Sequence, residues 1–285
     1  MESVRPPEPL RLGASTFVWG SRTYIVGIIN ATPDSFSGES VGSDPEAALR
    51  LAAAQVEAGA DILDIGGEST RPGARPVAAE EELQRVIPVI KTLAAHLAVP
   101  LSIDTTKAVV AREALAAGAQ LVNDINGFRG DPRLPAVVAE FGAAAVLMEN
   151  GRGVRYEDLI LEMIARLETS VTIATQAGVP RDRVILDPGL GFGKGTAKNL
   201  EIVRRLATFH TLGYSLLVGP SNKATIGAVL ELPVSERLEG TAAMVAMSIA
   251  NGADLVRVHN VKVMARVARM TDAIVRGYLT PGPLP

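Results

Sequence analysis

The sequence contains no cysteine, no long hydrophobic run and no excess of positive charge. The absence of cysteine excludes disulfide bonds and thiolate metal sites. No apolar run approaches the roughly 20 residues that a transmembrane helix needs, and the first ten residues, MESVRPPEPL, lack the apolar stretch of a signal peptide. The formal net charge of −3 argues against a surface for nucleic acid or anionic membranes. We therefore expect a cytoplasmic globular protein without nucleic-acid or membrane partners.

The chain has 285 residues, 47% of them hydrophobic, and contains eight short apolar runs that each end in polar or glycine-rich residues. These runs predict strands near 23–30, 61–66, 100–104, 120–124, 143–148, 183–187, 214–219 and 254–259. Helical periodicity between the runs indicates alternating strands and helices, which is typical of a parallel sheet covered by helices. An open doubly wound sheet is the alternative, but eight units favour closure. The predicted fold is therefore α/β, a single (β/α)8 TIM barrel.

Local signals mark where elements begin and end. Residues 10–20 alternate around Gly13, which predicts a short N-terminal β-hairpin that plugs the bottom of the barrel. Asp44 followed by Pro45 predicts a helix start. A glycine that suits a left-handed helix C-cap precedes a strand at Gly59, Gly118, Gly142 and Gly252. We expect an N-terminal extension and hairpin over 1–20 and one barrel domain over 21–280.

Three polar residues end predicted strands and should project toward the mouth of the barrel. In such barrels the loops at the carboxyl ends of the strands carry the catalytic groups. Asp104, Asn123 and Asp187 combine two acids with an amide, which suits a flat heterocycle with adjacent N–H donors, because a carboxylate accepts two parallel N–H bonds. The alternatives are a carboxylate cluster for a hard cation and ordinary N-caps of the following helices.

The last two predicted strands end in basic residues. Lys223 closes the segment GPSNK after the seventh strand, and Arg257 and His259 end the eighth, two residues apart and so on the same side. Loops after strands seven and eight are the usual phosphate site of these barrels. A guanidinium beside an imidazole therefore predicts a clamp for an oxygen anion. The alternative is that Arg257 and His259 are a pair in the barrel core or on the surface.

Two loops after the first two strands, NATPDSFSG at 30–38 and GGESTRPG at 66–73, have the glycine- and hydroxyl-rich composition of lids. The segment DPGLGFGK at 187–194 lacks the spacing and terminal Ser/Thr of a P-loop, and we reject that interpretation. With SIDTTK, VNDI, Ser-x-Lys and Arg-x-His, in this order between about residues 20 and 275, these motifs resemble the dihydropteroate synthases of the folate pathway.

The resemblance implies a transferase that condenses 6-hydroxymethyl-7,8-dihydropterin pyrophosphate with 4-aminobenzoate and releases pyrophosphate with Mg²⁺. By the family pattern, the pterin pyrophosphate contacts Asp104, Asn123, Met148, Asp187, Lys223, Arg257 and His259. The 4-aminobenzoate site would comprise Thr70, Arg71, Pro72, Phe192 and Ser221. Asn30 would bind Mg²⁺. The catalytic residues would be Lys223, Arg257, His259 and Asp34, the last facing the cation that develops as pyrophosphate departs.

The resemblance also implies a homodimer, for which the apolar faces of 235–250 and 262–277 are candidates. Three residues depart from the commonest family pattern: Glu149 stands where His is usual, Asn222 where Arg is usual and Asn260 where Asp is common. Asn222 removes a cation beside the predicted anion site. A non-catalytic pterin-binding paralogue is therefore one alternative function. A pterin-dependent methyltransferase, which would not require the GESTRPGA loop, is another.

Overall fold

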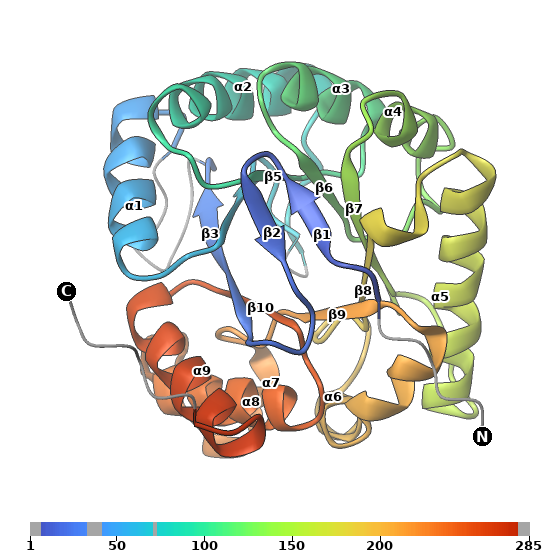
Figure 1. The fold of residues 1–285 in the computed structure, drawn as a ribbon. Helices are drawn as coiled ribbons and strands as arrows, with labels where there is room; N and C mark the ends of the chain where they lie inside the picture. Colours follow the sequence, from blue (N-terminus) through green and yellow to red (C-terminus); the bar gives the residue numbers. More distant parts are fainter. Residues whose placement is uncertain (1–6, 33–41, 71–72, 279–285) are drawn as a thin grey trace.

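The computed structural model describes residues 7–32, 42–70 and 73–278. Eight parallel strands close into a barrel in the order β10-β3-β4-β5-β6-β7-β8-β9, and helices surround it (Figure 1). The strands are β3 Tyr24–Asn30, β4 Ile62–Gly66, β5 Leu101–Asp104, β6 Leu121–Asp124, β7 Ala144–Met148, β8 Val184–Asp187, β9 Ser215–Val218 and β10 Leu255–Val258. The predicted TIM barrel is confirmed, and the closed ring excludes the open doubly wound sheet.

Helices follow the strands and cover the outside of the barrel. The α-helices are α1 Pro45–Glu57, α2 Ala79–His96, α3 Ala108–Ala116, α4 Leu134–Glu140, α5 Leu159–Gln176, α6 Thr196–Arg204, α7 Ala224–Leu230, α8 Leu238–Ala250 and α9 Val261–Val275. Short 3-10 segments are η1 Arg181–Arg183, η2 Leu206–Leu212 and η3 Val234–Glu236. The predicted boundary signals are confirmed. The Asp44 carboxylate accepts from the Glu46 N–H at 3.0 Å, and all four predicted C-cap glycines have positive φ.

The hairpin of β1 Leu10–Leu12 and β2 Ser15–Phe17 lies across the amino end of the barrel (Figure 1). Gly13, with φ at +56°, takes the left-handed conformation that the tight turn requires. Leu10, Leu12 and Phe17 are buried and pack against inward-facing strand residues such as Tyr24. As predicted, the hairpin plugs this end, so the barrel is open toward ligands only at the carboxyl ends of its strands.

Inward-facing side chains change from apolar to polar along the barrel axis. A cavity of about 10 Å³ on the axis is lined by Val26, Ile62, Asp64, Ser102, Leu121, Asn123, Val146, Ile185, Leu217, Leu255 and Arg257. The apolar members pack with the hairpin below. The polar members therefore form the floor of the mouth, where buried polar groups need hydrogen-bond partners.

Candidate active site

Arg257 occupies the centre of the mouth and joins three strands. Its Nε lies 2.5 Å from Asp64 Oδ2, and its Nη2 lies 2.7 Å from Asp104 Oδ2. Asn123 Nδ2 donates to the same Asp64 oxygen at 3.2 Å. The structure thus brings together three residues predicted from the sequence, and it adds Asp64, which the sequence analysis did not single out. A lone acid within the otherwise apolar strand β4 was the available signal, because a buried carboxylate requires a cationic partner.

The two predicted strand-end acids hold protons more tightly than ordinary carboxyl groups. Burial raises the pKa of Asp104 to about 7; the Arg257 charge opposes this shift and the nearby Asp64 carboxylate adds to it. Burial likewise raises the pKa of Asp187 to about 6, although its carboxylate accepts from the Gly189 N–H at 2.7 Å. A carboxylate that is shielded from water forms strong hydrogen bonds with a ligand that offers N–H donors.

Lys223 lies at the amino end of α7, where its stem passes over the loop after β8. Burial lowers the pKa of Lys223 to about 8, and the Asp187 charge opposes that shift. Lys223 Nζ is 4.8 Å from the centre of the Phe192 ring. Gly191 has φ at +83°, and a Cβ there would lie 3.0 Å from the Lys223 stem. Met148 pairs in register with Asp187, which places it at the same rim.

Ser221 and His259 join the loop after β9 to the end of β10. Ser221 Oγ is 2.8 Å from His259 Nδ1 and accepts from the His259 backbone N–H at 3.3 Å. Arg257 and His259 both lie at the carboxyl end, as predicted, but the Arg257 Nε and Nη2 already contact carboxylates. Its Nη1 has no hydrogen-bond partner among the residues that the structure describes. An anion bound here would meet that free N–H group.

The remaining predicted residues lie around this centre or outside the described ranges. Arg152, which the sequence analysis missed, donates from Nη2 to the Thr70 backbone oxygen, and its guanidinium carbon is 5.1 Å from the Phe192 ring centre. Asn30 ends β3, is partly buried and pairs in register with Gly66 of β4. Three predicted site residues lie outside the described residues: Asp34, Arg71 and Pro72.

Two of the departures from the family pattern have local structural roles. Asn222 has φ at +55°, a left-handed conformation that Asn adopts more readily than most residues. Its N–H donates to Thr241 Oγ1 at 3.1 Å, and its carbonyl accepts from Arg237 Nη1 at 3.1 Å. Asn260 caps α9, since its side chain accepts from the Val263 N–H at 3.1 Å. Asn260 therefore contributes through its side chain, whereas Asn222 contributes through its backbone conformation.

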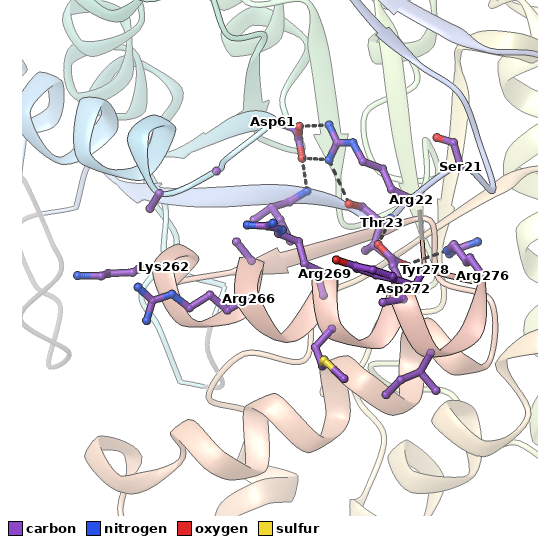
Figure 2. A pocket seen from close by; sticks show the side chains of 18 of the residues that line it. Ser21, Arg22, Thr23, Asp61, Lys262, Arg266, Arg269, Asp272, Arg276 and Tyr278 are labelled. Atoms are coloured by element: carbon purple, nitrogen blue, oxygen red, sulfur yellow. Dashed lines mark hydrogen bonds and ion pairs between the residues drawn. The ribbon is translucent and has the colours of Figure 1, made fainter. Parts of the chain in front are cut away.

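A groove of about 1480 Å³ lies at the opposite end of the barrel between α1 and α9 (Figure 2). Arg22 and Asp61 point toward one another there, 2.5 Å apart. The N–H and hydroxyl of Thr23 donate to the Asp272 carboxylate at 2.7 and 2.8 Å. These contacts satisfy the hydrogen-bonding groups involved. They join the starts of β3 and β4 to each other and β3 to α9. The groove contains none of the site residues predicted from the sequence.

Two absences can be stated for the described parts of the chain. Residues 7–32, 42–70 and 73–278 contain no group of three His, Cys, Asp or Glu side chains able to hold a metal ion, so the carboxylate-cluster alternative has no support there. Within the same ranges no helix has the length and apolar character needed to cross a membrane.

Comparison with known proteins identifies relatives over almost the whole chain. A family model for pterin binding enzymes matches residues 26–259. The chain is 46% identical over 278 residues to the dihydropteroate synthase of Synechocystis, covering 95% of this chain and 96% of the relative. A Clostridium difficile dihydropteroate synthase structure, determined in the presence of pteroic acid, has a TM-score of 0.87 at 46% identity and covers 91% and 99% of the two chains. A Xanthomonas albilineans dihydropteroate synthase structure with 4-aminobenzoic acid has a TM-score of 0.84 at 41% identity, with coverage of 90% and 94%.

Proposed function

The chain belongs to the dihydropteroate synthases, a family of pterin-binding transferases in folate biosynthesis, and we propose how its barrel mouth carries out the reaction. The reaction condenses 6-hydroxymethyl-7,8-dihydropterin pyrophosphate with 4-aminobenzoate to give 7,8-dihydropteroate and pyrophosphate. The observation that carries the assignment of this site is the convergence of buried acids and bases around Arg257 at one end of the barrel. Relatives with pteroic acid and with 4-aminobenzoic acid support both halves of the reaction.

The pterin ring is held by the polar floor of the mouth. Asp187 and Asp104 accept N–H groups from the amino-pyrimidinone edge, and Asn123 supplies both a donor and an acceptor. Met148 forms an apolar wall, since it lies beside Asp187 in the ladder. Lys223 donates to the ring from the opposite side, where the Asp187 charge supports its protonated form. Ring binding therefore satisfies groups that are costly to leave buried and unpaired.

The leaving pyrophosphate meets Arg257 and His259. The free Arg257 Nη1 and the imidazole of His259 stabilise negative charge as the bond to the pterin methylene breaks. Asn30, at the carboxyl end of β3, fits a Mg²⁺ ion held mainly by phosphate oxygens and water, which is the usual mode for this ion. Such an ion supplies charge neutralisation on the pyrophosphate oxygens. Asp34 is proposed to face the cation that develops on the pterin methylene.

The 4-aminobenzoate lies against the Phe192 ring. Ser221 and Thr70 contribute polar contacts, and Arg71 and Pro72 complete this site in our proposal. An aryl amine is already unprotonated at neutral pH, so the reaction needs charge stabilisation rather than a strong general base. The described site agrees with this requirement, because Arg257 at its centre is held by Asp64 and Asp104 and can face a departing anion.

Two further features of the family are extended to this chain as proposals. We place the enzyme in the cytoplasm and propose that it is a homodimer through α8 and α9, which pack side by side (Figure 1). Apolar side chains on these helices are exposed: Met247 at 50%, Met270 at 62% and Ile274 at 72%. Burying such side chains in a partner subunit is favourable. Sedimentation equilibrium at micromolar concentration should give a dimer mass, and a monomer mass would contradict the proposal.

The deciding experiment measures pyrophosphate release from the pterin substrate, with and without 4-aminobenzoate, in Mg²⁺ buffer. A dihydropteroate synthase releases pyrophosphate in amounts that match the dihydropteroate formed, and only when 4-aminobenzoate is present. A pterin-binding paralogue would bind the pterin without release. A methyltransferase would likewise show no aminobenzoate-dependent release. Either result would overturn the assignment.

A further inference from the structure

A buried ion pair lies behind Phe192, the residue proposed to contact 4-aminobenzoate. Neither member of the pair has a role in the site described above. Glu149 directly follows β7, and Lys194 ends the loop after β8. Lys194 Nζ is 2.6 Å from Glu149 Oε2, and neither side chain is exposed to solvent. Two charges removed from water are costly unless each is fully paired and hydrogen-bonded. Such a costly pair implies a structural role, and the other contacts of Glu149 and Lys194 indicate what that role is.

Lys194 joins the backbones of two loops. Its Nζ donates to the carbonyl of Glu149 at 2.9 Å, to that of Gly189 at 3.1 Å and to that of Phe192 at 3.2 Å. The loops touch directly, because a Cβ on Gly189 would lie only 2.2 Å from the Glu149 carbonyl oxygen. The loop 188–193 cannot move away from the end of β7 without breaking these contacts.

Glu149 fixes this junction to the outer helix layer. Its Oε1 accepts from the Tyr156 hydroxyl at 2.7 Å and from Arg166 Nε, on α5, at 2.7 Å. The carboxylate therefore has a partner on each side, with Lys194 toward the barrel and Arg166 toward the helices. The His that the family pattern usually has here would provide no permanent negative charge for Lys194. The pairing is a consequence of this chain's own departure from that pattern.

The loop held in this way carries the proposed binding surface for the arylamine. Two cations lie near the Phe192 ring, with Lys223 Nζ at 4.8 Å and the Arg152 guanidinium carbon at 5.1 Å from its centre. A second anchor holds the other side of the loop, since buried Asn199 accepts from the Gly191 N–H at 2.8 Å. The ring position thus depends on contacts to the loop backbone in addition to the two cations beside the ring.

We propose that Glu149 and Lys194 are positioning residues for 4-aminobenzoate. The pair fixes the loop after β8 and thereby the Phe192 ring, without touching either substrate. The substrate's identity rests on the proposed function above. Of the proposed pterin contacts, Asp104 and Asn123 lie at strand ends that the pair does not contact. Asp187 does adjoin this junction, since its carbonyl accepts from the Glu149 N–H at 2.8 Å, but it is fixed within β8. The pair should consequently affect the two substrates unequally, which a general loss of stability would not do.

Lys194→Met tests this split, because it removes the ammonium and keeps an unbranched apolar side chain. Displacement of a binding surface by a fraction of an ångström to 1 Å can cost about tenfold to a hundredfold. We expect the KM for 4-aminobenzoate to rise by about this factor, while the KM for the pterin substrate changes less than about threefold. Equal rises for both substrates, or no rise for 4-aminobenzoate, would overturn the proposal.

Two further variants separate positioning from stability. Asp61→Asn is the matched control, because it breaks the ion pair with Arg22 at the opposite end of the barrel; it should lower the melting temperature and leave both KM values unchanged. The double variant Glu149→Gln with Lys194→Met removes both charges. It should recover stability and keep the high aminobenzoate KM, because the three bonds to carbonyl groups are still missing. Recovery of the wild-type KM would instead attribute the defect to an unpaired charge.

Amide hydrogen exchange tests the junction without relying on turnover. In Lys194→Met, amides of residues 189–193 should exchange faster than in the wild type, while those of β5 and β6 should be unchanged. Unchanged exchange in the loop would overturn the positioning role even in an active enzyme. A wild-type enzyme without aminobenzoate-dependent pyrophosphate release would overturn the proposed function instead, so the two failures are distinguishable.

Discussion

The two ends of the barrel are built from the same eight strands but satisfy their polar groups in opposite ways. At the amino end, the hairpin fills the opening with apolar side chains, and the nearby charges pair with one another, as Arg22 does with Asp61. At the carboxyl end, burial moves the pKa values of Asp104, Asp187 and Lys223 toward neutrality. The amino end pairs its polar groups within the protein, whereas the carboxyl end keeps buried ionisable groups that a ligand can contact.

The difference separates the residues that stabilise this fold from those that act in it. Ionisable groups with displaced pKa values concentrate at functional sites, where they reduce stability in exchange for binding. A groove of about 1480 Å³ lies at the amino end, where Arg22 pairs with Asp61 and Thr23 with Asp272. The presence of a large groove therefore does not identify the site. Buried ionisable groups with displaced pKa values do, and they lie at the carboxyl end.

Phe17→Ala should produce the largest change in stability and little change in activity. Phe17 is buried in the hairpin and lies 4.9 Å from Tyr24, ring centre to ring centre. Truncating a buried Phe typically costs about 3–5 kcal/mol in unfolding free energy. Urea unfolding should show this loss, and the matched Val18→Ala, at a side chain exposed by 46%, should not. A large drop in kcat/KM of the folded variant would contradict the separation of the two ends.

Lys223→Ala and Asp104→Asn should give the converse result. Each removes a charge-assisted bond from a dry pocket, which should weaken pterin binding by about 1.5–3 kcal/mol or more. Stability should fall little, because both groups are themselves held in an unfavourable environment. Titration calorimetry with the pterin substrate measures the loss. Near wild-type affinity in both variants would refute the pocket assignment.

Asp104 should also make stability depend on pH. Its folded-state pKa, about 7, lies above the value of about 3.9 expected in the unfolded chain. The folded state therefore binds more protons between these values, and the unfolding free energy should fall as pH rises from about 4 to about 7, by at most about 1.4 kcal/mol per pH unit. Asp104→Asn should flatten this part of the profile. Superimposable urea-unfolding profiles for wild type and variant would rule out the shift.

Asn222→Arg should have the smallest effect on activity. It tests whether a cation beside the anion site matters at the carboxyl end. The family pattern usually has Arg at this position, so activity should be kept or improved. The left-handed backbone, with φ at +55°, should cost Arg up to about 1–2 kcal/mol of stability. Asn222→Gly, which relieves this strain without adding a charge, is the control. Complete loss of turnover in the Arg variant alone would show that the anion site has been rebuilt around Asn222.

The strand and helix pattern was predictable because its signals are local. Apolar runs gave all eight barrel strands, and the glycine caps after α1, α3, α4 and α8 have positive φ as expected. Motifs resembling a known family placed the candidate residues at strand ends. The sequence did not indicate that Arg257 would lie between Asp64 and Asp104, because Arg257 and Asp64 are 193 positions apart and meet only when the ring closes.

By itself, the sequence determined that the chain forms an eight-unit barrel, where each strand ends, and that Asp104, Asn123, Asp187 and Arg257 lie at strand ends. Those properties depend on side-chain periodicity and on short motifs, which act over a few residues. Only the tertiary structure decided how the groups are used, as the Glu149–Lys194 pair behind Phe192 illustrates. Charge pairing and pKa values depend on distances and burial across the barrel. These are set when remote strands become neighbours and water is excluded.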